Sequence, residues 1–514
     1  MISGWRVHVD GMAAEPLITL DGDRYRATFV GRIPPRRGRA DSTLMVLRTR
    51  YVGDGMREDI VLLNVGPEAA GVLITVAVEA DFADLFEVKG RAIPAGGVSV
   101  DLGANSLTYT WTTPGDTRSM QVTATSDPVL TPGTMTFRAV VPARGEWSTC
   151  LAVQVAINGR PLALRHPCGE RPNGSIPARR LRARRLTSPT MTTQDSLPVR
   201  TLRTSSADLG ALQIQDPDHP DRRVAAAGAP WFMALFGRDS LLTSWMALPL
   251  DQQLALGTLQ TLAEFQGTAV DPLTEEQPGR IVHEVRFGRE AKLALGGGKA
   301  YYGTADATPL FVALLGELHR WGLPGAELHA LLPAADRALS WIETYGDIDG
   351  DGFVEYRRAT DRGLINQGWK DSFDGVNDAA GRLGAPPIAL AEVQAYVYAA
   401  YRARSSIASA LGEERTAATY QSKAETLKAA FNERFWLPDR GWYAIGLDGD
   451  KRPLGALTSN MGHCLWCGII DDDKAPDVAN HLLDPRMWTG FGIRTLASTM
   501  GAYNPMAGRV CHRW

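Results

Sequence analysis

The residue of this sequence best suited to acid–base chemistry is Asp371, in the stretch Gly368-Trp-Lys-Asp-Ser372. Helical periodicity resumes only further along the chain, so we interpret the stretch as a loop between helices, where reactive groups often lie. Because Trp369 provides apolar surroundings, we expect the pKa of the Asp371 carboxyl to rise and the group to keep a proton near neutral pH. Asp371 is therefore a candidate proton donor. The alternative is that it only caps a turn or pairs with Lys370.

A second group of residues combines flat aromatic faces with opposite charges. Trp231 and Phe236 precede the adjacent pair Arg238 and Asp239, at the start of an apolar helical segment. Aromatic faces stack on sugar rings, and a neighbouring donor and acceptor bind hydroxyl groups. This pattern favours a carbohydrate subsite. The alternative is that Asp239 caps the helix and Arg238 is its surface partner.

Two later loops add polar side chains. His283 and Glu284 are adjacent and offer either an acid–base pair or metal ligands, but the sequence has no His-Glu-x-x-His spacing. We therefore predict no zinc site and interpret the pair as a hydrogen-bonding wall for a polar ligand. Asp306 stands before another helical segment, where it serves the same ligand or only caps the helix.

Two further motifs are interpreted as structural. The acidic run 347–356 resembles the opening of a calcium loop, but its twelfth position is Arg358 instead of Glu, which excludes an EF-hand. We predict that Phe353-Val-Glu-Tyr356 forms a short strand. Cys464 and Cys467 have the spacing of a redox or metal motif, yet they lack a second pair and are interpreted as incidental.

The elements that must position these residues differ along the chain. Residues 1–157 alternate apolar and polar side chains at period two between turn signals, which predicts an antiparallel β-sandwich. Residues 158–204 are rich in proline and arginine and are interpreted as a linker, or less simply as a polyanion site. Residues 205–514 show helical periodicity, with short and long loops alternating. This order predicts a toroid of helical hairpins whose long loops meet at one mouth.

The composition limits the classes of partner. The 514 residues are 44% hydrophobic with a net charge of −3, which is typical of a globular protein and gives no reason to expect nucleic acid or a membrane surface. The first residues lack the apolar run of a signal peptide, and no window is long enough to span a bilayer. Five cysteines, an odd and sparse set, argue against a disulfide framework. We expect a cytoplasmic protein with no cofactor and no metal.

Four segments together resemble the amylo-alpha-1,6-glucosidase-like family of glycogen-debranching relatives. They are Trp231–Ser240, Tyr302–Leu310, Gly368–Ser372, and Gly492–Leu496 followed by Tyr503-Asn-Pro505. The early segment Leu47–Met56 resembles the N-terminal sandwich domain of the same family. The resemblance implies a β-sandwich followed by an (α/α)6 barrel. It also implies hydrolysis of α-glucosidic bonds, with inversion, in an oligosaccharide or a small glucoside.

The motif positions imply roles for individual residues. Asp371 would be the general acid, and the sugar subsite beside it would be shaped by Trp231, Arg238, Asp239 and Asp306. The full set of substrate-binding residues that we expect is Trp231, Phe236, Arg238, Asp239, His283, Glu284, Asp306, Trp369 and Glu392.

The last residues depart from the family pattern. Relatives would be expected to continue past Tyr503-Asn-Pro-Met506 with a Ser-Tyr-His…Trp-Pro-His-Asp type of segment, whereas this sequence continues to Trp514 with other residues. We therefore expect a truncated toroid that lacks its last helices and its general base. If the base lies within the chain, the candidates are Glu392, Glu355 and Glu284. The alternatives to a hydrolase are a non-catalytic carbohydrate-binding remnant and a phosphorylase that uses phosphate in place of water.

Overall fold

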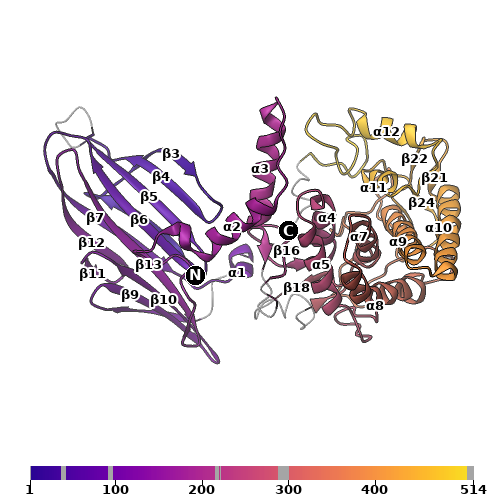
Figure 1. The fold of residues 1–514 in the computed structure, drawn as a ribbon, viewed down its shortest axis with the longest axis horizontal. Coiled ribbons are helices and arrows are strands. Elements are labelled where there is room, and N and C mark those ends of the chain that lie inside the picture. The colour runs from indigo at the N-terminus through magenta and orange to yellow at the C-terminus, as the bar shows by residue number, and fades with distance from the viewer. Residues whose placement is uncertain are drawn as a thin grey trace. The chain divides into compact units, whose positions relative to one another are not determined.

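The computed structural model describes residues 2–35, 42–90, 96–214, 219, 221–286 and 300–505. The chain divides into two compact units, Met1–Ala211 and Leu212–Trp514, and each is described by itself (Figure 1). No helix of the described residues is long and apolar enough to cross a membrane.

The first unit is built from two antiparallel sheets. One sheet has the strand order β11 (Val129–Thr131), β12 (Thr134–Val141), β7 (Ala70–Ala80), β1 (Ile2–Val9) and β2 (Met12–Ala13). The other has the order β3 (Glu15–Asp21), β4 (Arg26–Arg32), β5 (Leu44–Val52), β6 (Gly55–Asn64), β13 (Glu146–Ile157), β10 (Asp116–Ala124), β9 (Ser106–Thr113) and β8 (Gly97–Leu102), with β14 (Arg160–Pro161) beside β13. A short helix, α1 (Leu85–Gly90), lies between β7 and β8 in the chain.

The core of this unit lies between the two sheets. Alternate residues of β7, among them Ile74, Val76 and Val78, are buried in one apolar cluster with Leu107 and Tyr109 of β9. In a strand every second side chain lies on the same face, so a strand with one buried face alternates apolar and polar residues in the sequence. The predicted antiparallel sheet domain is confirmed.

The segment interpreted as a linker contains regular structure. Its elements are η1 (Pro172–Gly174), α2 (Ile176–Thr187) and the first part of α3 (Ser196–Ala211). Ser175 caps α2 by accepting a hydrogen bond from the backbone N–H of Ala178, which explains how a proline-rich stretch starts a helix. The arginine run lies on α2, where Arg185 pairs with Asp23 at 2.9 Å.

The structure corrects the expectation drawn from the cysteine count, because Cys150 and Cys168 form a disulfide. The chain turns back on itself after β13, so that β14 pairs with β13 through Ile157 and Arg160. This reversal brings two residues with a sequence separation of 18 to the same place. An odd number of cysteines excludes complete pairing but leaves room for one bond.

The second unit consists of helical hairpins (Figure 1). The consecutive pairs are α4 (Gly237–Ala247) with α5 (Gln252–Glu264), α7 (Ala307–Arg320) with α8 (Gly325–Trp341), α9 (Ala391–Ala410) with α10 (Glu414–Phe435), and α11 (Asn460–Cys467) with α12 (Ala475–Leu483). A π-helical turn, η2 (Ile342–Gly346), follows α8. The first helices of successive pairs pack on one another, α4 on α7, α7 on α9 and α9 on α11. A helical unit after the sheet unit is confirmed.

Burial differs from helix to helix. Nearly every side chain of α7 is buried, whereas α5 buries one stripe that includes Leu254, Thr258 and Leu262. Spacing of four residues puts such a stripe on one face of a helix. Short strands pair with one another in the segments before and between the hairpins. They are β15 (Gln213–Ile214) with β16 (Val224–Ala225), β17 (Leu235–Phe236) with β18 (Glu284–Val285) and β19 (Ala300–Tyr301), β20 (Ala389–Leu390) with β23 (Gly446–Leu447) and β24 (Pro453–Leu454), and β21 (Trp436–Leu437) with β22 (Trp442–Tyr443).

Candidate active site

A cavity of about 380 Å³ lies among helices and loops of the second unit. Its lining residues are Ala227, Phe232, Phe236, Arg238, Asp239, Leu242, Trp369 and His463. Four of the residues expected at a sugar subsite are therefore brought together, namely Phe236, Arg238, Asp239 and Trp369. Phe232 and His463 are lining residues that the sequence did not single out. Phe232 lies within the segment Trp231–Ser240 that carries the family resemblance, whereas the only pattern near His463 is the cysteine spacing beside it.

The charge centre of the site is Arg238, in the first turn of α4 and only 5% exposed. Its Nη2 donates to the Asp371 carboxylate at 2.5 Å, and its Nη1 donates to Asp306 at 3.2 Å and to the Gly368 carbonyl at 2.9 Å. Its Nε lies 3.8 Å from Asp239 Oδ2. One buried guanidinium thus faces three carboxyl groups.

This arrangement differs from the capping roles that the local patterns also allowed. Phe236 occupies the N-cap position of α4, so Asp239 lies within the first turn and does not cap the helix. Asp306 occupies the N-cap position of α7 but makes no side-chain capping bond. Both carboxyl groups point instead to the guanidinium of Arg238.

The protonation of Asp371 follows from this geometry. Burial raises the pKa of Asp371 to about 6, the neighbouring Arg238 opposes the rise, and the carboxyls of Asp239 and Asp306 add to it. Burial also raises the pKa of Asp239, against the same opposing effect of Arg238. Because one guanidinium cannot neutralise three carboxyl groups, Asp371 keeps its proton up to about pH 6, and a minor fraction of the molecules keeps it at neutral pH. A carboxyl of this kind is suited to general-acid chemistry.

Buried hydrogen bonds fix the loop that carries Asp371. On one side, the Tyr356 hydroxyl donates to Asn366 Oδ1 at 2.8 Å, and Asn366 Nδ2 donates to the Ser372 carbonyl at 2.6 Å. On the other, Lys370 Nζ donates to the Thr495 carbonyl at 2.7 Å, whereas the alternative interpretation paired Lys370 with Asp371. The loop is thereby held to two distant parts of the chain.

Glycine is required in this loop for close packing. A Cβ atom added at Gly368 would stand 2.3 Å from Leu390 Cδ1, too close for any real contact. Glycine has no Cβ atom, so the loop can pass this close to Leu390.

Two buried polar atoms at the cavity have no hydrogen-bond partner among the described residues. They are the indole N–H of Trp369, a donor, and Asp239 Oδ2, an acceptor. A buried polar group without a partner costs about 1–3 kcal/mol, so such atoms persist where a ligand satisfies them. With the aromatic faces of Phe232 and Phe236 beside them, they suit a ligand that carries both hydroxyl groups and an apolar ring face.

Several predicted residues lie outside the cavity lining. The ring of His283 packs edge-on against Phe236, at 5.7 Å between ring centroids. Burial, and then the charges of Arg238, Arg286 and Arg280, lower its pKa well below the ordinary value, so the imidazole is neutral. Glu284 pairs with Arg286 at 2.7 Å.

Asp306 and Asp371, the partners of Arg238, also lie outside the lining, as do Trp231 and Glu392. Arg286 Nη1 donates to the Trp231 carbonyl at 3.0 Å. Glu392 is completely buried at the start of α9 and accepts a hydrogen bond from Asn460 Nδ2 at 2.8 Å. Burial raises the pKa of Glu392 to about 7.

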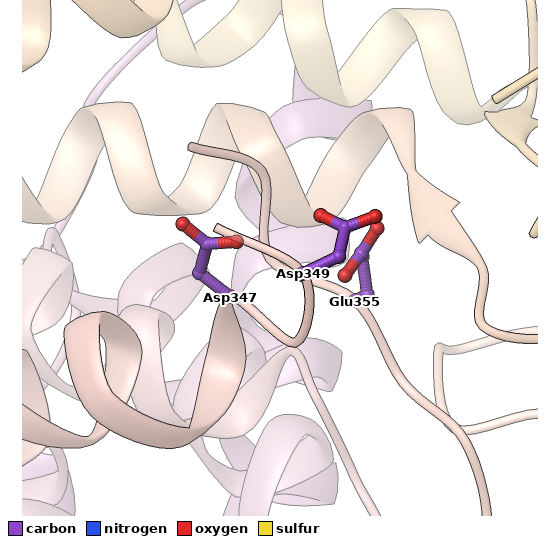
Figure 2. Close-up of side chains that lie close together, drawn as sticks. All are labelled: Asp347, Asp349 and Glu355. Carbon is purple, nitrogen blue, oxygen red and sulfur yellow. The ribbon is translucent and has the colours of Figure 1, made fainter. Parts of the chain in front are cut away.

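The acidic run near residue 350 is held by a lysine. Asp347, Asp349 and Glu355 each place a carboxylate oxygen within 4.8 Å of the others (Figure 2). The ammonium of Lys451 pairs with Asp349 at 3.0 Å and also contacts Glu355, so a cation from the chain itself lies among these carboxylates. Residues 353–356 do not form the predicted strand, and only an isolated bridge joins Tyr356 to Ile388.

The comparisons with known families divide the chain in the same order as the fold. Residues 1–152 match the N-terminal domain of (some) glycogen debranching enzymes. Residues 291–514 match the mannosylglycerate hydrolase MGH1-like glycoside hydrolase domain. The resemblance to debranching relatives is thus confirmed. A comparison with curated proteins finds no match.

Solved structures of similar fold are sugar-active enzymes. A putative kojibiose phosphorylase from the human microbiome has a TM-score of 0.50 and 8% identity, with 87% of this chain and 61% of that chain covered. A GH78 rhamnosidase of Bacillus sp. GL1 has a TM-score of 0.42 and 13% identity, with 89% and 38% covered. A rhamnosidase from Klebsiella oxytoca with rhamnose bound has a TM-score of 0.43 and 12% identity, with 93% and 79% covered. At these identities the likeness concerns the fold alone, and the chain spans 38% of the Bacillus enzyme.

Proposed function

We propose that this chain, which belongs to the glycoside hydrolase and phosphorylase-like enzymes through its debranching-enzyme N-terminal domain and its MGH1-like hydrolase domain, hydrolyses α-glucosidic bonds with inversion. The observation that carries the proposal is the position of Asp371, a carboxyl with a pKa of about 6 that is bound to Arg238 beside the cavity. Asp371 donates its proton to the glycosidic oxygen as the bond from that oxygen to the anomeric carbon breaks. The leaving group departs as an alcohol, and Arg238 stabilises the carboxylate that remains. A water molecule forms the new bond to the anomeric carbon from the opposite face and releases one proton, which balances the proton given by Asp371.

The cavity supports recognition of a sugar ring. Phe232, Phe236 and Trp369 supply aromatic faces, while the unpaired indole N–H of Trp369 and Asp239 Oδ2 supply a donor and an acceptor. Arg238 holds Asp239 in place, so that the acceptor is ready before the sugar enters. A site ordered in this way loses little conformational entropy on binding.

Inversion also requires a carboxylate that activates water, about 6.5–9.5 Å from the acid. We assign no general base among the described residues. Of the three candidates, Glu284 pairs with Arg286, Glu355 with Lys451, and Glu392 is buried against Asn460. None of the three belongs to the cavity lining. Asp371 lies outside this lining as well, but each of the three glutamates is in addition engaged by another residue of the chain. Their engagement favours carbohydrate binding without turnover as the second candidate function.

A phosphorylase is less well supported. Phosphate binding needs cationic side chains directed at the anion. Arg238, the cationic residue of the cavity lining, already faces three carboxyl groups. A dianion would meet repulsion from these carboxyls, whereas water and neutral sugars would not.

The test is glucose release from maltose, isomaltose and 4-nitrophenyl α-glucoside, with and without phosphate. We expect Asp371→Asn to lower kcat about 10²–10⁴-fold, because the amide has the same shape but no acidic proton. The matched control is Asp361→Asn, an exposed aspartate of the same loop segment. A rate within about threefold of the parent would remove Asp371 from the acid role. Sugar binding without turnover would support the second candidate, and phosphate-dependent formation of a sugar phosphate would support a phosphorylase.

A further inference from the structure

His463 lies on the cavity wall in a position that no motif indicated. It stands on α11 and lines the cavity together with Trp369, and the two ring centroids are 5.8 Å apart with a tilt of 34°. In the sequence, His463 is merely the neighbour of Cys464 and was not connected with the sugar subsite.

The orientation of the His463 ring is fixed by its contacts with Tyr396. The hydroxyl of Tyr396, a fully buried residue of α9, lies 2.7 Å from His463 Nδ1. The two rings meet edge to face, at 5.9 Å between centroids and an angle of 84°. Since Tyr396 engages Nδ1, the other ring nitrogen, Nε2, remains for a further interaction, and the described residues supply none.

The imidazole carries no charge at physiological pH. Burial, and then the nearby ammonium of Lys370, lower the pKa of His463 to about 4. A neutral imidazole has one donor nitrogen and one acceptor nitrogen, so Nε2 offers a single uncharged hydrogen bond. Such a group favours a hydroxyl over a carboxylate or phosphate of the ligand, because it does not compensate a negative charge.

We infer that His463 is a specificity-determining residue of the sugar subsite, whose Nε2 binds one hydroxyl group of a neutral hexose unit held against Trp369. The inference rests on the proposed function and adds to it the class of the bound unit. Trp369 N–H and Asp239 Oδ2 also lack a hydrogen-bond partner among the described residues, so with His463 Nε2 three polar atoms belong to residues that line one cavity. Three separate hydrogen bonds fix the orientation of a ring more closely than aromatic stacking does.

A purely structural role for His463, as a spacer between Tyr396 and Trp369, makes a different prediction. A spacer affects the binding of all sugars alike, whereas a hydroxyl-binding residue affects only sugars that carry the hydroxyl it binds. This difference determines the choice of ligands for the test.

The test is calorimetric titration of the full chain with methyl α-D-glucoside and its monodeoxy derivatives. We expect His463→Phe, which keeps the aromatic volume, to weaken binding of the parent glucoside about three- to tenfold. One monodeoxy glucoside should bind the unchanged protein more weakly than the parent glucoside does, by the same factor. The His463→Phe variant should bind that derivative and the parent glucoside with equal affinity. His463→Gln should recover most of the affinity, and His329→Phe, at an exposed histidine of α8, should change nothing.

The outcomes separate the two proposals. If the unchanged protein binds the glucoside and His463→Phe binds it equally well, or weakens all derivatives by one factor, the role of His463 is refuted while the proposed function stands. If the unchanged protein binds none of the glucosides, the proposed function fails and this inference fails with it. If His463→Phe does not fold, NMR of the unchanged protein replaces it. The ¹⁵N resonance of His463 Nε2 is assigned by its loss in His463→Gln, and we expect it to shift when the glucoside is added. An unshifted resonance would equally refute the inference.

Discussion

Replacement of Glu392 by glutamine should change how the stability of the helical unit depends on pH. The carboxyl of Glu392 is completely buried, Asn460 donates a hydrogen bond to its Oε2, and its Oε1 has no hydrogen-bond partner among the described residues. Glutamine has the same shape and can still accept the bond from Asn460. The substitution therefore removes the charge and leaves the packing nearly unchanged.

The sign and size of the effect follow from the pKa of Glu392, which burial raises from 4.5 to about 7. The folded state binds this proton more tightly than the unfolded state, so the stability from the group is fully present below pH 4.5 and is lost as the pH rises to 7. Each pH unit in this window costs about 1.4 kcal/mol. Above pH 7, ionised Glu392 thus destabilises the fold by about 3 kcal/mol, and Glu392→Gln escapes this loss.

The assay is urea unfolding followed by circular dichroism at 222 nm, which reports chiefly on the helical unit, at pH values from 5 to 8. We expect the free energy of unfolding of the unchanged protein to fall relative to Glu392→Gln by about 2–3 kcal/mol over this range. The matched control is Glu433→Gln, an exposed glutamate of α10, which should follow the unchanged protein at every pH. Asp371 titrates in both proteins, so its contribution cancels in the difference. Parallel profiles for the unchanged protein and Glu392→Gln would refute the reasoning.

Three further predictions concern the cavity and the sheet unit. Asp371 must be protonated to act as an acid, and its pKa is raised to about 6, so kcat/KM for 4-nitrophenyl α-glucoside should decline as the pH rises above 6. If kcat/KM does not change up to pH 8, Asp371 is not the acid. Trp369→Phe keeps the aromatic face but removes the unpaired indole N–H, so binding of methyl α-D-glucoside should weaken about three- to tenfold in calorimetry. Equal affinities would show that no hydroxyl reaches this nitrogen. Serine at both Cys150 and Cys168 should lower the free energy of unfolding of the sheet unit by about 3 kcal/mol, the value for a closed loop of this length. Urea unfolding without reductant measures this, and a difference that persists in dithiothreitol would assign the effect to packing instead of the bond.

The sequence by itself determined the succession of a sheet unit and a helical unit. Side-chain periodicity is a local property, because period two and period three to four arise from the geometry of a single strand or helix. Local chemistry likewise indicated Asp371, Arg238 and Asp239 as reactive or sugar-binding residues, and their types follow from what a carboxyl or a guanidinium does in any site. The disulfide between Cys150 and Cys168 was missed, because the count of cysteines says nothing about which two residues a chain reversal brings together.

Only the tertiary structure decided which of these groups meet. Arg238 faces carboxyls that lie 68 and 133 residues away in the chain, so its partners could not be found from neighbouring residues. The packing of α9 against α11 brings the Tyr396 hydroxyl to Nδ1 of His463, although the sequence around His463 resembles an incidental cysteine motif. Burial also set the pKa values of Asp371 and Glu392, since desolvation depends on the whole surrounding unit. Each candidate residue could therefore be proposed from its own type and neighbours in the sequence. The distances between these residues, their partners and their protonation depend on long-range packing, which no local pattern encodes.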